Sequence, residues 1–248
     1  MLKASLLLLM LLSACWIVYC LLPTLWYKRL QNHSLPIGQA AASPLLLTFD
    51  DGPDQQYTAE LLDLLQEEQV KALFFVLLDK ALARPELVDR MLAEGHQLGL
   101  HGLDHKSMWL MSPREVQDRF ERALGLCRRQ GWQPIYYRPP HGHVNLFTIA
   151  AAKKAGFLPM FWTAMAQDWQ EQASAFSIYK KLTKRGKPGA VICLHDCGQD
   201  TGGAIHGPAK TIEALGRFLP EAREQGYTFI TPYNPSVGTA SHPLMEGQ

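Results

Sequence analysis

The chain has 248 residues, which suits one domain of ordinary size behind a short apolar segment. Its formal net charge is +1, so composition gives no electrostatic reason to expect nucleic acid or another polyanion as a partner. Five cysteines are present, of which Cys127, Cys193 and Cys197 lie outside the apolar segment. Because these three are an odd number, the sequence excludes a complete disulfide framework there.

The chain begins with an apolar segment, residues 1–27, that carries no charge between Ala4 and Tyr27. The uncharged run has about 24 residues, whereas roughly 20 cross a bilayer as a helix and roughly 7–15 form the apolar part of a cleaved signal peptide. We therefore expect an uncleaved membrane anchor. The alternative is a lipoprotein signal, because residues 12–15 resemble one and would make Cys15 a lipidated N-terminus. Basic residues flank both ends of the segment, so charge gives little indication of its orientation.

Residues 44–233 alternate between strand-like and helical patterns, which predicts parallel pairing and an α/β fold. Seven strands in one domain favour a closed or nearly closed barrel over an open sheet. Ser112 and Glu115 have the spacing of a capping box at the start of one helix. We expect a linker at 28–43 and a flexible tail at 234–248, where small and polar residues dominate. The predicted strands are 45–49, 72–76, 97–100, 135–137, 157–163, 190–194 and 227–230, and the predicted helices include 57–69, 85–94, 112–131 and 208–225.

Titratable residues follow five of the seven predicted strands. In α/β barrels the C-terminal ends of the strands converge and form the active site, so we expect these residues to lie at one rim. Each motif alone has an ordinary structural explanation, because Asp, Gly and Pro favour turns and loop histidines are commonly solvated. The functional argument therefore depends on their order and placement. The five segments are 48–53 (Thr-Phe-Asp-Asp-Gly-Pro), 101–105 (His-Gly-Leu-Asp-His), 138–142 (Arg-Pro-Pro-His-Gly), 168–169 (Asp-Trp) and 195–196 (His-Asp).

These residue types supply what hydrolysis of an amide needs. His101 and His105 can direct two imidazoles at one ion, and a carboxylate would complete the three protein ligands that are typical of catalytic zinc. Such a metal lowers the pKa of its bound water to about 7 and polarises a carbonyl group. A second carboxylate can act as a general base, and a separate histidine can protonate the departing amine. The adjacent Asp50 and Asp51 suit this division, with one carboxylate on the metal and its neighbour facing the water.

In the order of its five motifs, residues 44–232 resemble the polysaccharide deacetylases, the NodB-homology family of carbohydrate esterases. The resemblance implies a distorted (β/α) barrel, often of seven strands. It also implies a hydrolase of carbohydrate metabolism that removes acetyl groups from N-acetylhexosamine units of a cell-envelope or extracellular polysaccharide, such as peptidoglycan or a chitooligosaccharide. The expected cofactor is Zn²⁺, with Co²⁺ or another divalent ion as the alternative. The expected location is the cell membrane, with the domain outside the cytoplasm.

The same resemblance implies roles for the matched positions that carry the chemistry. It implies that Asp50 is the general base and that His195 is the general acid. The metal ligands implied by the family motifs are Asp51, His101 and His105.

Other matched positions are implied to support these groups. Arg138 would hold and tune the base, and Asp168 would orient the acid and favour its charged form. The backbone N–H of His141 would stabilise the oxyanion. Trp169 and Leu194 would help to form the wall of the acetyl pocket.

Three positions depart from the family pattern. Gly102 stands where the family has Ser or Thr, Met165 where it often has Asp, and His141 where it often has an aromatic residue. Every expected metal-binding and proton-transfer position is filled, so we interpret the departures as those of a divergent subfamily with an altered substrate preference.

Two other functions remain open at this point: a non-catalytic glycan-binding envelope protein, and a metal amidase or esterase that acts on a non-sugar substrate. A further hypothesis is that oxidation of Cys193 and Cys197 modulates activity, because the two thiols flank His195.

Overall fold

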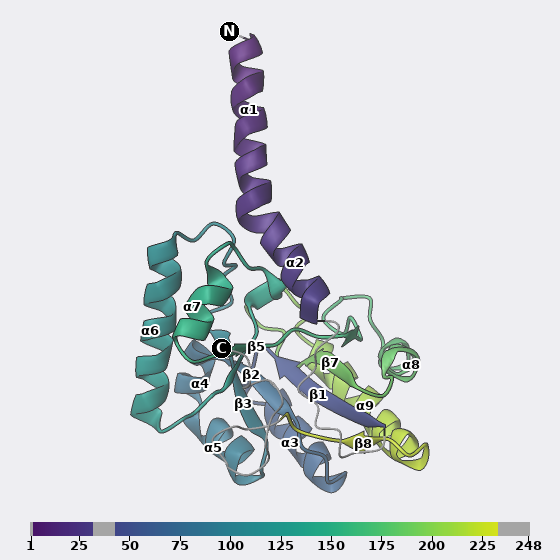
Figure 1. Cartoon of the computed structure of the whole chain (residues 1–248). Helices are drawn as coiled ribbons and strands as arrows, with labels where there is room; N and C mark the ends of the chain where they lie inside the picture. Colours follow the sequence, from purple (N-terminus) through teal and green to yellow (C-terminus); the bar gives the residue numbers. More distant parts are fainter. Residues whose placement is uncertain (1, 32–42, 233–248) are drawn as a thin grey trace, which may run out of the picture.

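The structure is a computed structural model that describes residues 2–31 and 43–232 (Figure 1). It contains a parallel α/β domain and an N-terminal helix that projects from this domain (Figure 1). The helix continues to Gln31, so the first residues of the predicted linker are helical. The remainder of that linker up to residue 42, and the predicted tail at 234–248, lie outside the described residues.

The sheet is built from eight short strands, and every recorded strand pair is parallel. The strand order is β5-β4-β3-β2-β1-β7-β6, and β8 pairs with the start of β1. This curled sheet confirms the predicted α/β fold with a distorted barrel of about seven strands. The strands are β1 (Pro44–Asp50), β2 (Leu73–Leu77), β3 (Gln97–Gly102), β4 (Tyr136–Tyr137), β5 (Leu158–Pro159), β6 (Ala164–Met165), β7 (Ala190–His195) and β8 (Thr228–Phe229).

Helices cover the outer face of the curled sheet (Figure 1). The predicted capping box is present at α6, where Ser112 Oγ accepts the Glu115 N–H at 3.3 Å and Glu115 Oε2 accepts the Ser112 N–H at 2.7 Å. The sequence did not predict α4, α7 or α8. The helices of the domain are α3 (Tyr57–Glu67), α4 (Leu78–Ala83), α5 (Pro85–Ala93), α6 (Pro113–Gln130), α7 (Thr148–Lys154), α8 (Ala175–Arg185) and α9 (Gly207–Glu224).

The central strand β1 shows how both faces of the sheet are buried. Leu45, Leu47 and Phe49 belong to the large cluster between the sheet and the helices. Leu46 belongs to a smaller apolar cluster inside the barrel. Because side chains alternate along a strand, the same register directs Asp50 toward the interior at the C-terminal end of β1.

The predicted strand at 157–163 is wrong in detail, because the chain leaves the sheet between β5 and β6. The guanidinium of Arg138 occupies this gap: its Nε donates to the Met160 carbonyl at 3.1 Å and its Nη2 to the Phe161 carbonyl at 2.8 Å. These two carbonyls are therefore satisfied without a neighbouring strand.

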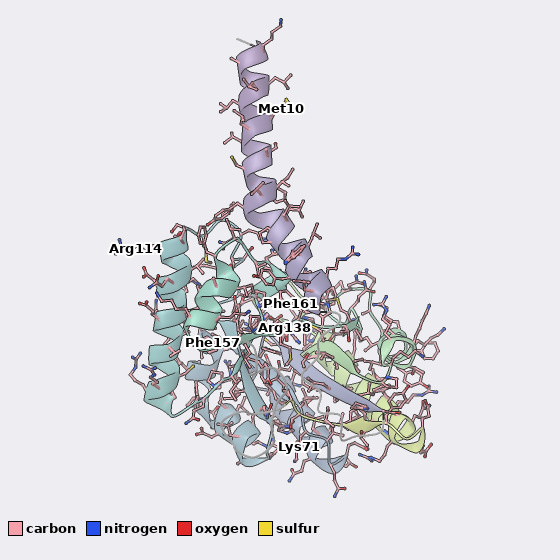
Figure 2. The ribbon with its side chains drawn as sticks, in the orientation of Figure 1. Met10, Lys71, Arg114, Arg138, Phe157 and Phe161 are labelled. Carbon is pink, nitrogen blue, oxygen red and sulfur yellow. The ribbon has the colours of Figure 1, made fainter. Side chains whose placement is uncertain are left out.

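The N-terminal helix consists of α1 (Leu2–Trp16), a π-helical turn (Ile17–Leu21) and α2 (Leu22–Gln31). Within the described part of the chain, Lys3–Leu30 is the one helix long and apolar enough to cross a membrane. Figure 2 shows Met10 on the part that projects from the domain, and Lys71 at the opposite end of the molecule. The segment α2 packs against the domain, near the C-terminal ends of the strands.

Candidate active site

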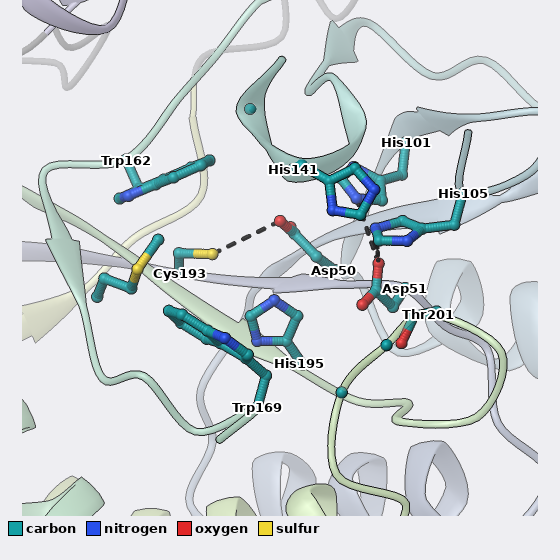
Figure 3. A pocket seen from close by; sticks show the side chains of 14 residues that line it. Asp50, Asp51, His101, His105, His141, Trp162, Trp169, Cys193, His195 and Thr201 are labelled. Atoms are coloured by element: carbon teal, nitrogen blue, oxygen red, sulfur yellow. Dashed lines mark hydrogen bonds and ion pairs between the residues drawn. The ribbon is translucent and has the colours of Figure 1, made fainter. Parts of the chain in front are cut away.

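The five polar segments meet at the C-terminal ends of the strands, around one cavity of about 350 Å³ (Figure 3). This is the rim at which the sequence placed them, because parallel strands bring these ends to the same edge. Arg138 and Asp168 lie directly behind the cavity, and each is bonded to a residue that lines it. The lining residues from the predicted set are Asp50, Asp51, His101, His105, His141, Trp169 and His195.

One carboxylate and two imidazoles form a group with the donor set of a metal site. Asp51 Oδ1 lies 3.3 Å from His101 Nε2 and 3.1 Å from His105 Nε2, as the dashed lines of Figure 3 mark. One ligand atom from each residue lies within 4.8 Å of the others. Burial raises the pKa of Asp51, but the hydrogen bonds of the two histidines outweigh it and hold this pKa well below its usual range. An anionic oxygen and two ring nitrogens that converge in this way fit a divalent cation.

The backbone fixes the orientation of one of these imidazoles. His101 Nδ1–H donates to the Arg138 carbonyl at 2.9 Å, because a carbonyl oxygen can only accept. The other ring nitrogen, Nε2, faces Asp51 at 3.3 Å and is therefore the nitrogen that a cation bound beside Asp51 would meet. Histidines that bind metals are commonly held by such a bond at the second nitrogen.

The loop between the two histidines requires Gly102. Its φ is +135°, and a Cβ at this position would lie 3.0 Å from the Asp104 carbonyl oxygen. Asp104 is in turn held by ion pairs to Arg119 and Lys106. Glycine at this position therefore suits the loop conformation that brings His101 and His105 together.

The adjacent carboxylate, Asp50, is held by a buried guanidinium. Arg138 Nη1 donates to Asp50 Oδ1 at 2.7 Å and to Thr48 Oγ1 at 2.7 Å. The guanidinium is completely buried and stacks on the Phe75 ring, with 4.1 Å from its central carbon to the ring centroid. The second oxygen, Asp50 Oδ2, accepts a weak hydrogen bond from Cys193 Sγ at 3.5 Å. These hydrogen bonds hold the Asp50 carboxylate in a fixed position at the edge of the cavity.

A second buried pair joins His195 to Asp168. The ring nitrogen His195 Nδ1 lies 2.9 Å from Asp168 Oδ1. Asp168 Oδ2 accepts the backbone N–H of His195 at 2.8 Å and the Thr211 hydroxyl at 3.0 Å. Burial lowers the pKa of His195, but the charge and hydrogen bond of Asp168 raise it more, to about 10. The imidazole therefore carries a proton at neutral pH.

His141 lines the cavity from the short turn that follows β4. Its φ of 58° lies in the left-handed region, which is unusual for a residue other than glycine. In this conformation its ring packs edge-on against the His105 ring, with 4.3 Å between the centroids. The departure from an aromatic residue at this position thus places a third imidazole beside the metal group.

The wall of the cavity differs from the prediction at Leu194. Leu194 is fully buried in the cluster between the sheet and the helices, because its strand neighbours Cys193 and His195 point into the cavity. Trp169 and Met165 do line the cavity, and so does Trp162, which the sequence did not single out.

The two thiols that flank His195 are free and buried. Burial raises the pKa of Cys193 well above its usual range, and burial likewise raises that of Cys197 to about 11. Neither thiol therefore has the thiolate character that oxidation requires, which disfavours the redox hypothesis. Asp50, Cys193 and His195 also lie within 4.8 Å of one another, but the protonated imidazole and the neutral thiol make this a poorer set of metal ligands.

Asp196 supports the loop that carries the two aspartates, a role that the sequence did not reveal. Its Oδ2 accepts the Thr58 hydroxyl at 2.6 Å. A Cβ at Gly52 would collide with the same carboxylate, so glycine is required there. Burial raises the pKa of Asp196 to about 7. The only sequence signal for this contact was the position of Asp196 beside His195.

Known proteins are similar to this chain in sequence and in fold. The sequence profile described as polysaccharide deacetylase matches residues 38–160. A peptidoglycan-N-acetylglucosamine deacetylase of Bacillus cereus is 32% identical over 189 residues, which cover 75% of this chain and 85% of that protein.

Two solved structures are similar over the whole domain. The peptidoglycan N-acetylglucosamine deacetylase Bc1960, in complex with 4-naphthalen-1-yl-N-oxidanyl-benzamide, is 30% identical with a TM-score of 0.68 and covers 76% of this chain and 85% of its own. A family 4 acetyl xylan esterase from Clostridium thermocellum, in complex with a cobalt ion, is 27% identical with a TM-score of 0.67 and covers 75% of this chain and 87% of its own. The chain therefore belongs to the polysaccharide deacetylase family.

Proposed function

We propose that this protein is a membrane-anchored, metal-dependent deacetylase that hydrolyses the acetamide of N-acetylhexosamine units in a cell-envelope or extracellular glycan. The observation that carries the proposal is the placement of a fixed carboxylate, a protonated imidazole and a carboxylate–bis-histidine group around one cavity. The names of the relatives support the acetylated glycan as the substrate class.

Asp51, His101 and His105 would hold the divalent cation, with zinc as our first candidate. When bound, a divalent cation supplies a Lewis acid that polarises the acetyl carbonyl and lowers the pKa of a water molecule. The cobalt ion in the related esterase supports a site that accepts more than one metal.

Asp50 is proposed as the general base that takes a proton from the attacking water. Arg138 bonds to one of its oxygens and leaves the other directed at the cavity. The guanidinium thereby fixes the orientation of the carboxylate, with 2.7 Å between Arg138 Nη1 and Asp50 Oδ1. Arg138 is thus a positioning residue for the base.

His195 is proposed as the general acid that protonates the departing nitrogen. Asp168 holds the proton at Nδ1, so the other nitrogen, Nε2, is the one directed at the substrate. A pKa of about 10 keeps the ring charged before reaction. This favours cleavage of an amide over an ester, because an amine must gain a proton to leave while an alkoxide needs it less.

The remaining lining residues are proposed to bind the substrate. The backbone N–H of His141 would donate to the oxyanion that forms at the acetyl carbonyl. Trp169 packs edge-on to His195, with 5.3 Å between the ring centroids, and together with Met165 and Trp162 would enclose the acetyl methyl group. Leu194 has no place in this pocket.

The helix Lys3–Leu30 is proposed as the membrane anchor, with the domain on the outer side of the membrane. A glycan of the cell envelope would then be within reach of the site. Lipidation of Cys15 would give a tethered protein as well, and mass analysis of the N-terminal peptide distinguishes the two.

The test is acetate release by the full chain in detergent, with N-acetylglucosamine oligomers, simple acetamides and acetate esters as substrates. We expect activity on the oligomers that a chelator abolishes and zinc restores. Asp50→Asn should lower kcat by about 10²–10⁴-fold, because it removes the general base while the metal group stays intact. The matched control is Asp89→Asn, an exposed aspartate on α5. A fully active Asp50→Asn variant would remove Asp50 from the base role, and release from acetamides but no sugar would point to a non-sugar substrate.

A further inference from the structure

The N-terminal helix is joined to the rim of the active site by polar contacts along its second half. Three of its side chains bond to backbone carbonyls of the loops that precede α6 and α7. The donors and acceptors are Tyr19 Oη to the Met111 carbonyl at 2.7 Å, Cys20 Sγ to the Trp109 carbonyl at 3.1 Å and Thr24 Oγ1 to the Val144 carbonyl at 2.8 Å.

A proline makes a backbone contact possible as well. Pro23 has no N–H, so it cannot bond to the carbonyl of Tyr19, its partner in an α-helix. The helix forms a π-helical turn over Ile17–Leu21, and the Tyr19 carbonyl accepts the Leu146 N–H at 3.0 Å instead. The helix and the domain thus share a backbone hydrogen bond, and their relative position is fixed.

The docked part of the helix is also part of the membrane span by length. About 20 residues are needed to cross the roughly 30 Å of hydrocarbon, so a span that begins at Ala4 ends near Pro23. The contacts with the domain begin earlier, at Trp16, whose ring packs edge-on against Trp109 with 5.3 Å between the centroids. The loops that touch Trp16 and Tyr19 must therefore reach the hydrocarbon layer.

The side chains of those loops suit this depth. Leu110 is 83% exposed and Leu146 is 56% exposed, and both border a shallow apolar cavity of about 620 Å³ against residues 14–20 of the helix. On the outer face of α2, Leu25 and Trp26 are 55% and 63% exposed. Exposed apolar surface that continues from a membrane span marks contact with lipid.

A cationic cavity lies next to the catalytic one, on the side of the helix. It has a volume of about 450 Å³, contains Lys28 and Arg185, and shares Trp162 and Met165 with the catalytic cavity. Lys28 Nζ lies over the Trp162 ring at 5.4 Å from its centroid. Among the described residues, no carboxylate lines this cavity and none pairs with Lys28.

The depth of Lys28 indicates which anion this cavity would take. Lys28 lies five positions after Pro23, or about 8 Å along a helix at 1.5 Å per residue. The headgroup layer extends roughly 5–7 Å beyond the hydrocarbon on each side. Lys28 therefore leaves the helix at about the outer edge of the headgroup layer, so its side chain is within reach of the lipid phosphates, and the catalytic cavity lies beside it.

We propose that the substrate is an N-acetylhexosamine joined through a phosphate to a membrane lipid, with its phosphate bound between Lys28 and Arg185 and its acetamide in the catalytic cavity. The proposal rests on the deacetylase function and the anchoring proposed above. The reaction adds one water, breaks the amide C–N bond and yields acetate and the free amine. The bonds from sugar to phosphate and from phosphate to lipid stay intact.

The first experiment compares three substrates with the full chain in lipid nanodiscs loaded with zinc. They are a lipid-linked N-acetylglucosamine phosphate, the water-soluble sugar phosphate and a neutral N-acetylglucosamine oligomer. We expect the highest kcat/KM for the lipid-linked substrate. We compare kcat/KM on the lipid-linked substrate with kcat/KM on the oligomer. Lys28→Met should lower the ratio of the first to the second by about tenfold, the effect of one lost charge-assisted hydrogen bond. Arg29→Met, the exposed neighbour, should leave the ratio unchanged.

The substrate comparison separates the possible failures. Equal kcat/KM for the lipid-linked substrate and the soluble sugar phosphate would show that phosphate alone is recognised, which overturns the membrane-borne substrate. An unchanged ratio in Lys28→Met would overturn the phosphate subsite. Acetate from none of the three substrates would overturn the deacetylase function itself.

A second experiment tests the membrane contact without any measurement of activity. A benzophenone amino acid is placed at Leu110 of the full chain, which is then irradiated in phospholipid vesicles and analysed for lipid adducts. The matched control carries the benzophenone amino acid at Leu92, an exposed leucine on α5. Leu92 accepts a backbone hydrogen bond from Gly95, which lies near Lys71 at the opposite end of the domain. Adducts at Leu110 alone support contact between its loop and the lipid. Equal adducts at the two positions, or none at either, would overturn this contact.

Discussion

Two buried carboxylate–cation pairs border the cavity, and they differ in whether the cation can release a proton. Asp50 pairs with Arg138, and arginine side chains do not serve as proton donors in proteins. Asp168 pairs with His195, whose imidazole can give its proton away. The first pair holds a carboxylate in place, and the second keeps an imidazole protonated. In the proposed mechanism the first pair therefore supplies the base and the second pair the acid, because the two cations differ in this respect.

The largest expected effect comes from breaking the permanent pair. Arg138→Met leaves Asp50 buried without its cation and leaves two backbone carbonyls without donors. Removal of one partner from a buried ion pair costs about 3–5 kcal/mol of unfolding free energy. Chemical denaturation in detergent checks this, with the exposed Arg128→Met on α6 as the control. A loss no larger than that of Arg128→Met would mean that the pair does not hold the barrel together.

The next largest effect should come from removing the protonated imidazole of His195. His195→Asn should lower kcat on acetamides by about 10²–10⁴-fold, the usual contribution of a general acid, with a smaller change in KM. The loss should be smaller on acetate esters, because an alkoxide needs less protonation to leave. Steady-state kinetics on matched amide and ester substrates measures both. Equal losses on the two substrates would argue against proton donation as the role of His195.

A milder change, Asp168→Asn, keeps the imidazole of His195 but alters its pKa. Asp168 raises the pKa of His195, so Asp168→Asn should lower this pKa from about 10. In the proposed mechanism His195 acts in its protonated form, so activity should be lost as pH rises through its pKa. The alkaline limb of the kcat profile should therefore move to lower pH in Asp168→Asn. Thr211→Val, which removes only a hydroxyl bonded to Asp168, is the control and should move the limb much less.

The smallest effect concerns the loop that carries the two histidines of the metal group. Gly102→Ser restores the residue type of the family but places a side chain at a φ of +135°, close to the Asp104 carbonyl. We expect a loss of about 1–2 kcal/mol in unfolding free energy and weaker zinc binding, both measurable by titration. Gly125→Ala, in the middle of α6, should stabilise the protein by about 1 kcal/mol. A neutral or stabilising Gly102→Ser would mean that the loop relaxes.

The sequence predicted the barrel and the convergence of its motifs because both follow from local patterns. Alternating strands and helices require parallel pairing, and parallel pairing brings Asp50, His101 and His195 to one rim. The placement of Leu194 was wrong, although period-two alternation between Cys193 and His195 would have directed it outward.

Other features were beyond local patterns because they depend on contacts between distant segments. The break between β5 and β6 depends on the guanidinium of Arg138. The roles of Trp162 and Lys28 depend on the docking of the helix, which hydropathy cannot reveal. Hydropathy identified the apolar helix but not the contacts that its second half makes with the domain.

The N-terminal helix also covers part of the domain, so its removal would expose groups of the domain that it now contacts. Tyr27 packs on the small cluster of Val144, Ile149 and Phe161, so a chain shed by proteolysis after the anchor would lose this cover as well as its location. The carbonyl groups that Tyr19 and Thr24 now satisfy would be left to solvent, and the loop beside the site would lose its support. Under the proposed anchoring, a domain released without this helix would lack part of its own wall and should be less stable and less active than the full chain.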